Sequence, residues 1–222
     1  MLAHYINKEM EKKTRKLSLV QKEILFGVIL GDAHLETQDN RITYRVKFQQ
    51  SLKHSPYIDH LYEIFKDYVV TPPEHCIITD KDGNASTTVT FVTVSSSMFT
   101  FFGKQFYKNN KKVVPKLIHR WLTPRALAYW YMDAGWKKSA KTTDVMLNTQ
   151  CFSHTEVTRL CDVLKKKFNL ECFVRKQKNN KYQIYVSEKS YETLRGLIHN
   201  FFIPEMKYKF PLLRKNRFNT NA

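Results

Sequence analysis

The sequence is short of acidic residues and of long apolar runs. Lys and Arg total 37 against 20 Asp and Glu in 222 residues, which gives a formal net charge of +17. Like charges repel in a folded chain, so this excess favours an anionic partner, and nucleic acid before an anionic membrane. No apolar run reaches the roughly 18 residues that span a bilayer. Hydrophobic residues make up 42%, which is enough for a packed core.

Paired cysteine motifs are also missing. The four cysteines contain no C-x-x-C pair, which disfavours a zinc ribbon and predicts free, partly buried thiols in a reducing compartment. The 8 histidines are scattered and form no metal-binding pattern. The first 16 residues mix acidic with basic side chains and show no secretory signal. They also differ from the acid-poor leaders of organelle import.

Two short apolar runs, about half a chain length apart, resemble each other. The first spans residues 25–33 (LFGVILGDA) and the second spans residues 127–135 (LAYWYMDAG). Each run has the length of a short helix and ends in small and acidic residues. The pair indicates an internal repeat.

Similar patterns follow each run. Polar and apolar side chains alternate as in strands over 41–50 and 145–152. Amphipathic helices are predicted over 57–69 and 154–168. Hairpins with central turn signals are predicted with strands 76–79 and 87–94, and with strands 172–176 and 182–186. Closing helices are predicted over 98–107 and 191–201. Each half therefore reads helix–strand–strand–helix–strand–strand–helix, and two copies predict a monomer with an internal pseudo-two-fold axis.

The repeats divide the chain into five predicted segments. They are a basic N-terminal extension over 1–20, a first repeat over 21–107, a linker over 108–123, a second repeat over 124–212 and a basic tail over 213–222.

The two runs resemble the LAGLIDADG motif, and the chain over about residues 20–212 resembles the monomeric, double-motif homing endonucleases. Shorter matches to that type are LTP at 122–124, LAYW at 127–130 and LNTQ at 147–150. One degenerate motif is weak evidence, whereas two motifs followed by the same strands are specific. The resemblance implies a mixed α+β fold of two αββαββα repeats with saddle-shaped antiparallel sheets and two packed central helices. The sequence supports that packing, because Gly27 and Gly31 lie on one helix face and allow close approach; Ala128 offers a smaller such surface in the second motif.

The resemblance also implies a chemistry. In this family the last acidic residue of each motif helps to hold Mg²⁺ between an attacking water and the scissile phosphate of duplex DNA. That position is Asp32 in the first motif and Ala134 in the second. Alanine has no oxygen to offer a metal. Asp133 lies one residue earlier, about 100° round a helix, so we expect it to point elsewhere. The chain is then expected to hold one Mg²⁺ ion or none, and double-strand cleavage should be impaired.

Further residues are candidates for binding and catalysis. By resemblance, Lys112 and Lys209 match a pair of lysines near the active sites, where they would order water or offset phosphate charge. Strand residues are the candidates for base and phosphate contacts, since a β-ribbon fits the major groove. The set comprises Arg41, Thr43, Arg45, Lys47, Gln49, Lys137, Lys138, Lys141, Asn148, Gln150, Arg175, Lys176 and Gln177.

Two functions remain open. The first is a site-specific DNA endonuclease in which Ala134, introduced or inherited, blocks efficient cutting. The second is a natural, non-cleaving descendant that binds structured RNA, as an intron maturase or as a structural component of an organellar ribonucleoprotein such as a mitochondrial ribosome. A third reading, an unrelated basic domain, is disfavoured by the paired motifs. The Lys- and Asn-rich segments indicate an AT-rich gene. Such a gene favours an organelle-encoded protein, from a mitochondrion before a chloroplast. The target sequence and the natural ligand are not encoded in any recognisable pattern.

Overall fold

The computed structural model of the protein describes residues 16–79, 82–139 and 142–211. The basic tail predicted over 213–222 and most of the extension predicted over 1–20 lie outside the described residues. Among those described, no helix combines the length and apolarity needed to cross a bilayer.

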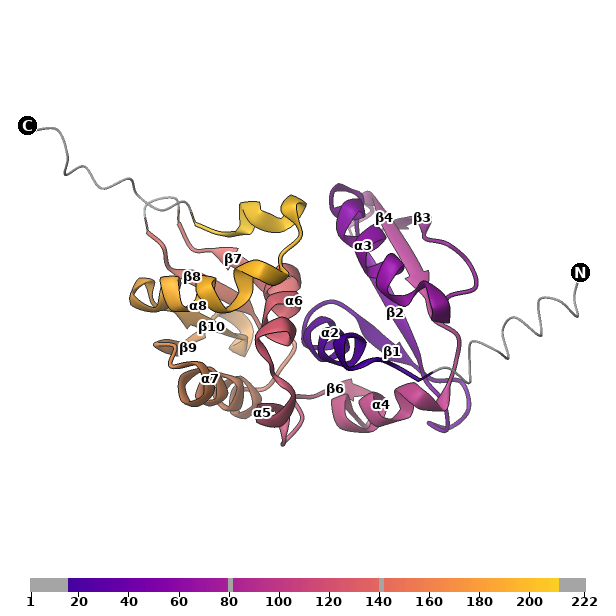
Figure 1. Ribbon diagram of the computed structural model, residues 1–222, viewed down its shortest axis with the longest axis horizontal. Helices are drawn as coiled ribbons and strands as arrows, with labels where there is room; N and C mark the ends of the chain where they lie inside the picture. The colour runs from indigo at the N-terminus through magenta and orange to yellow at the C-terminus, as the bar shows by residue number, and fades with distance from the viewer. Residues whose placement is uncertain (1–15, 80–81, 140–141, 212–222) are drawn as a thin grey trace, which may run out of the picture.

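The two halves repeat one order of elements (Figure 1). The first half contains α2 (Leu19–Leu30), β1 (His34–Glu36), β2 (Arg45–Ser51), α3 (Ser55–Phe65), β3 (Glu74–Thr79), β4 (Ala85–Val92) and α4 (Thr100–Phe106). The second contains α6 (Pro124–Ala134), β7 (Gly135–Lys137), β8 (Val145–Asn148), α7 (His154–Phe168), β9 (Cys172–Lys176), β10 (Tyr182–Val186) and α8 (Tyr191–Ile198). The described part of the chain thus has the predicted αββαββα order twice.

Each half contains one antiparallel four-stranded sheet. The strand orders are β1-β2-β4-β3 and β7-β8-β10-β9, which are the same order in the two repeats. Helices cover one side of each sheet, and the apolar phase of the strands faces them, as Val46 and Phe48 in β2 illustrate. The mixed fold predicted from the sequence is confirmed.

The motif helices α2 and α6 pack side by side at the centre, between the two sheets (Figure 1). Ser18 caps α2 in a capping box with Gln21, and Thr123 caps α6 ahead of Pro124. A Cβ atom on Gly27 would lie only 2.3 Å from the Ala126 carbonyl oxygen. The predicted close approach is therefore present, although the nearest backbone on α6 is that of Ala126 and not Ala128.

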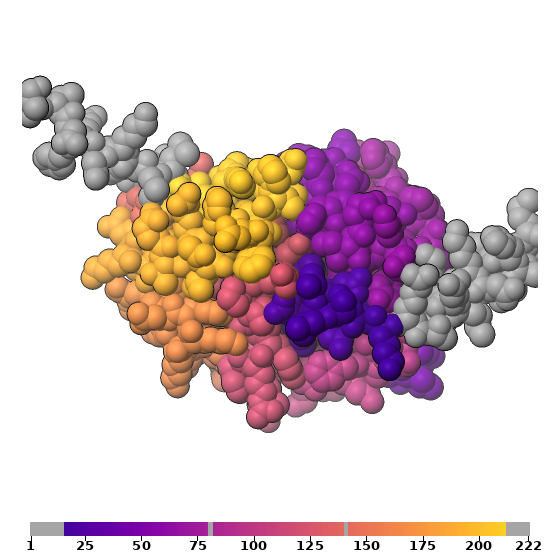
Figure 2. All heavy atoms as spheres, in the orientation of Figure 1, coloured from indigo at the N-terminus to yellow at the C-terminus, as the bar shows by residue number. Residues whose placement is uncertain are grey.

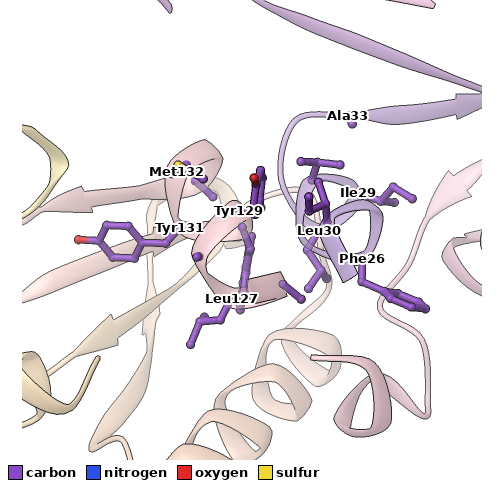
Figure 3. Packing of buried hydrophobic residues seen from close by; sticks show 14 of the residues in the cluster. Phe26, Ile29, Leu30, Ala33, Leu127, Tyr129, Tyr131 and Met132 are labelled. Atoms are coloured by element: carbon purple, nitrogen blue, oxygen red, sulfur yellow. The ribbon is translucent and has the colours of Figure 1, made fainter. Parts of the chain in front are cut away.

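Bulky side chains anchor each motif helix in its own half. Figure 3 shows Phe26 pointing away from α6 and Tyr131 pointing away from α2. Phe26 packs on Phe102 of α4 with 4.9 Å between ring centroids, and Tyr131 stacks on Phe210 at 5.9 Å. The halves also touch at the surface, where the indigo start of the first half abuts salmon-pink and yellow parts of the second half (Figure 2). An ion pair between Glu23 and Arg125 joins α2 to α6 there.

Several predicted elements are shorter in the structure, including both closing helices, α4 and α8. The strand expected over 41–50 starts at Arg45, because Asn40 and Arg41 have left-handed backbones with φ of 52° and 71°. The helix expected over 57–69 ends at Phe65 and continues as the 3-10 turn η2 (Lys66–Tyr68). The strand expected over 145–152 ends at Asn148, ahead of the Ser153 cap of α7.

The segment between the repeats is more ordered than a plain linker. It forms a hairpin of β5 (Tyr107–Lys108) and β6 (Lys111–Lys112), turned by Asn109 and Asn110 in left-handed conformations. The short helix α5 (Ile118–Trp121) follows and leads into α6. The remaining 3-10 turns include η7 (Pro204–Lys209), which lies against β7 and α3.

Candidate functional site

The candidate active centre lies where α2 and α6 end. Asp32 follows α2 and is exposed, whereas Ala134 closes α6 and is buried. Asp133 lies beside them, and its Oδ2 accepts a hydrogen bond of 3.1 Å from the Asp32 backbone N–H. The centre of the molecule therefore holds two neighbouring carboxylates, one on each motif helix.

We expected Asp133 to point away from the catalytic position, but its carboxylate lies beside Asp32. A Cβ atom on Gly31 would lie 2.3 Å from Asp133 Oδ2, so the carboxylate occupies the space that a side chain at Gly31 would need. Since Gly31 and Asp133 are matching positions of the two motifs, they face each other across the helix pair. Because Gly31 has no side chain, the Asp133 carboxylate fits between the two helices.

The two carboxylates differ in their surroundings. Burial, and then the negative charge of Asp32, raise the pKa of Asp133 well above its ordinary value. The Asp32 N–H and the Lys209 charge oppose that rise only in part. Asp32 faces solvent and accepts a 2.7 Å hydrogen bond from Gln50 Nε2. Asp32 is thus the more exposed carboxylate, and Asp133 is half-buried at the helix interface.

Gln50 is a member of this centre that the sequence did not single out. Its amide nitrogen lies 2.7 Å from Asp32 Oδ2 and 3.4 Å from Asp133 Oδ1. Gln50 follows Val46 and Phe48 in the core-facing phase of β2, where a polar side chain is unexpected. The sequence did contain one signal for Gln50: it is a polar residue at a position where the alternation in β2 predicts an apolar one.

Lys112 and Lys209, predicted near the active sites, lie at the ends of the two motif helices. Lys112 Nζ donates to the Gly31 and Ala33 carbonyls at 2.8 and 2.9 Å. Lys209 Nζ donates to the Asp133 carbonyl at 2.9 Å and to the Met132 carbonyl. Burial lowers the pKa of both lysines. Each ammonium group satisfies carbonyls that a helix C-terminus leaves free, and both sit close to Asp32 and Asp133.

The outer face of the first sheet is polar. Arg45, Lys47 and Gln49 alternate with the buried phase of β2 and point away from the helices, as predicted. Arg45 pairs with Glu36 at 2.7 Å, and Gln49 donates to Thr88. The face is therefore rich in hydrogen-bonding groups, which is what contact with base edges and phosphates requires.

Arg41 and Thr43 do not belong to that strand face. Arg41 sits in the left-handed turn before β2, and its guanidinium donates to Asn110 Oδ1 at 3.0 Å. The Thr43 hydroxyl donates to Asp39 Oδ2 at 2.5 Å. The Asp39 carboxylate also accepts from the Thr43 backbone N–H, and these hydrogen bonds hold the turn. Both side chains thus form hydrogen bonds within the protein, Arg41 to the β5–β6 turn and Thr43 to the turn before β2.

The residues predicted in the second half do not all share one face. Asn148 and Arg175 share the outer face of the second sheet, on either side of Gln183. Lys137 and Lys176 alternate to the opposite face, while Gln150 and Gln177 lie just beyond strand ends. Lys138 is exposed and lies 3.4 Å from Asp144. Lys141 lies outside the described residues.

A row of apolar side chains crosses the outer face of the second sheet. Strand register places Trp136, Met146, Tyr185 and Phe173 side by side on β7, β8, β10 and β9. Trp136 and Phe173, at the two ends of the row, are 41% and 47% exposed. No pattern in the sequence marks this row, because its members come from four separate strands.

Comparison with known proteins assigns the chain to a family. The model of the LAGLIDADG DNA endonuclease family matches residues 22–194. The chain is 36% identical over 207 residues to the "Probable intron-encoded endonuclease 1" of Wickerhamomyces canadensis, covering 91% of this chain and 88% of that protein. It is 30% identical over 215 residues to the "Cytochrome b mRNA maturase bI2" of Saccharomyces cerevisiae, covering 91% of this chain and 50% of that protein.

A solved structure agrees. The homing endonuclease I-WcaI bound to its DNA recognition sequence superposes with a TM-score of 0.84 at 34% sequence identity, covering 95% of this chain and 93% of that one. The paired motifs, the repeated sheets and these matches lead to one conclusion: the chain belongs to the LAGLIDADG DNA endonuclease family.

Proposed function

We propose that the protein binds duplex DNA site-specifically across the outer faces of its two sheets and is impaired in double-strand cleavage. The observation that supports this most directly is the asymmetry of the centre. Asp32 is open to solvent, Ala134 has no ligand oxygen, and Asp133 is turned into the helix interface. A single open carboxylate serves one strand at most.

The donor set fits one divalent ion. Mg²⁺ prefers oxygen ligands and is commonly held by one or two carboxylates, with substrate phosphate and water completing its shell. Asp32 would hold the ion, and Gln50 would orient the Asp32 carboxylate. Among the described residues, no cluster of three or more His, Cys, Asp and Glu side chains offers a closed metal centre. When bound, the ion would neutralise charge that develops on phosphate oxygens.

The protein's own residues would prepare this site. Lys112 and Lys209 hold the C-terminal carbonyls of the motif helices and so fix the positions of Asp32 and Asp133. Their positive charges also offset the two carboxylates and an incoming phosphate. Arg45, Lys47 and Gln49 would contact the DNA half-site on the first sheet, with Asn148 and Arg175 on the second.

A salt titration tests the DNA-binding proposal. A duplex is first selected from a randomised library by repeated rounds of binding to the purified protein. Its affinity is then measured between 50 and 200 mM KCl. If six or more phosphates are neutralised, we expect the affinity to fall by about a thousandfold or more. A flat salt dependence, or failure to enrich any duplex, would contradict the proposal.

A second function, RNA binding in an organelle, is favoured by the similarity to proteins named as mRNA maturases. We propose that the same basic surface also accommodates structured RNA, as a maturase or as a component of a mitochondrial ribonucleoprotein. Sequencing the nucleic acid that copurifies with the protein from its own cells discriminates the two. Enrichment of one intron or ribosomal RNA supports the RNA function, whereas enrichment of genomic DNA alone contradicts it.

A further inference from the structure

The outer face of the second sheet differs in chemistry from that of the first. On the first sheet, the row that runs through His34, Lys47 and Val92 is mostly polar. On the second sheet, the matching row consists of Trp136, Met146, Tyr185 and Phe173. Three of these four side chains are aromatic, and the row crosses all four strands, a span of about 14 Å at the usual strand spacing.

The rings of this row are arranged as a platform. Phe173 and Tyr185 lie nearly parallel, with 6.2 Å between ring centroids and 29° between ring planes. The Tyr185 hydroxyl donates to Asp144 at 2.6 Å, which fixes its ring. Trp136 and Phe173 stay exposed at the two ends, on edge strands. Between them lie Met146, which is buried, and Tyr185, which is half-buried. Two large exposed side chains that flank an apolar row in this way indicate a contact surface.

Positive charge surrounds the platform. Lys138 Nζ lies 4.7 Å from the Tyr185 ring centroid, and Lys165 Nζ lies 5.3 Å from that of Phe173. Arg175 is exposed on the same face, one register step along the strands. A partner that covers this face must therefore complement both flat apolar rings and cations. Nucleotides do so, since each joins a flat base to a phosphate.

We infer that the outer face of the second sheet is a stacking platform for the unpaired bases of a single-stranded nucleic acid. Bases inside a duplex stack on one another and are not free to lie on protein rings, whereas unpaired bases stack on aromatic side chains. Trp136 and Phe173 take one base each, and Tyr185 lies between them. Lys138, Lys165 and Arg175 contact the phosphates. This inference rests on the RNA-binding function proposed above. It shares Arg175 and the sheet face with the proposed duplex contacts, so a duplex and a single strand would exclude each other there.

Affinity for single strands tests the platform. The probes are fluorescein-labelled 12-nucleotide oligouridine RNA and oligothymidine DNA, with the selected duplex measured in parallel. Trp136→Ala and Phe173→Ala should each weaken single-strand binding by roughly 5- to 100-fold. Leu117→Ala is the matched control, because Leu117 is apolar, is 40% exposed and precedes α5, outside both sheets. It should leave single-strand affinity within about twofold.

Two conservative variants separate stacking from general apolar contact. Phe173→Tyr keeps the ring and should retain single-strand binding, whereas Phe173→Leu keeps apolar area without the ring and should lose it. If Phe173→Tyr and Phe173→Leu lose single-strand affinity to the same extent, or both retain it, the inference is overturned. Binding to RNA, to DNA or to both supports the platform, and the tighter of the two identifies the natural strand.

The parallel duplex measurement separates the two proposals. If the wild-type protein binds the selected duplex but neither single strand, the platform is wrong and the proposed DNA function stands. If it binds neither, both fail. Capture of a protein partner whose binding depends on Trp136, without any single-strand binding, would also overturn the inference.

Discussion

The two halves share one topology and differ in the chemistry placed on it. Both sheets have the same strand order, and both motif helices end at the centre. The first half ends its helix in the exposed Asp32 and presents a polar sheet face. The second half ends in the buried Ala134 and presents an aromatic row from Trp136 to Phe173. The difference shows that a repeated scaffold fixes where functional groups stand without fixing which groups they are.

The centre makes the same point at atomic scale. Gly31 and Asp133 are matching positions, but the first has no side chain and the second fills the space left by it. Helix α2 thereby provides the space, and α6 provides the carboxylate that fills it. The asymmetry requires close packing of the helices: a Cβ atom at Gly27 would meet the Ala126 backbone, and one at Gly31 would meet the Asp133 side chain.

The largest effect is expected from separating the halves. Gly27→Leu would drive a side chain into the Ala126 carbonyl and Tyr129. We expect a loss of about 3 kcal/mol or more in unfolding free energy, because backbone cannot yield as a flexible side chain does. Gly196 in α8 is the matched control, since a Cβ there meets nothing within 4 Å. Gly196→Ala should be neutral or slightly stabilising. Denaturant unfolding checks both, and equal stability of the two variants would mean that the helices do not pack face to face.

The lysines at the helix ends are expected to matter about equally in the two halves. Lys112→Met or Lys209→Met removes two hydrogen bonds to helix-end carbonyls. Leaving buried carbonyls unsatisfied should cost about 1–3 kcal/mol in each case. Lys111→Met, at the exposed neighbouring position, should change stability by no more than about 0.5 kcal/mol. If only one of the two buried lysines proves sensitive in chemical denaturation, the helix ends are not equivalent.

A smaller, pH-dependent effect is expected at Asp133. Its folded-state pKa is raised by burial and by Asp32, so the wild-type protein loses stability as pH rises through that pKa. Asp133→Asn removes this loss. The variant should exceed wild type by about 1–2 kcal/mol at neutral pH, or roughly 2–8 °C in Tm. The advantage should shrink as pH falls to and below the ordinary Asp value of 3.8, because the carboxyl group then becomes protonated in both the folded and the unfolded state. Thermal melts across pH 3.5–8 measure it; an advantage that grows towards acid pH would contradict the burial of the charge.

Long, strongly patterned elements were predictable from the sequence. Helix α7 and strands β9 and β10 have the predicted bounds, because a capping box at Ser153, an amphipathic stripe and a hairpin turn are all local signals. Strands β1 and β7 were not located, since three residues are too few to show alternation. The left-handed turn at Asn40 and Arg41 likewise shortened a strand that appeared continuous in sequence.

The active centre was predictable only in part. Asp32, Lys112 and Lys209 were identified through the motif, and the structure brings them together. The position of Asp133 depends on Gly31 in the other half of the chain, which no local pattern reports. The aromatic row depends in the same way on the register of four strands. Contacts between distant segments decide both features.

Plasmid cleavage tests the central claim, that only the first half keeps an open catalytic carboxylate. A supercoiled plasmid with the selected duplex is incubated with the protein and Mg²⁺, and nicked and linear products are separated on a gel. We predict at most nicked circles for wild type, loss of nicking in Asp32→Asn, and linear product in Ala134→Asp. Direct linearisation by the wild-type protein would contradict the account, because it would require a second working carboxylate in the half that ends in Ala134.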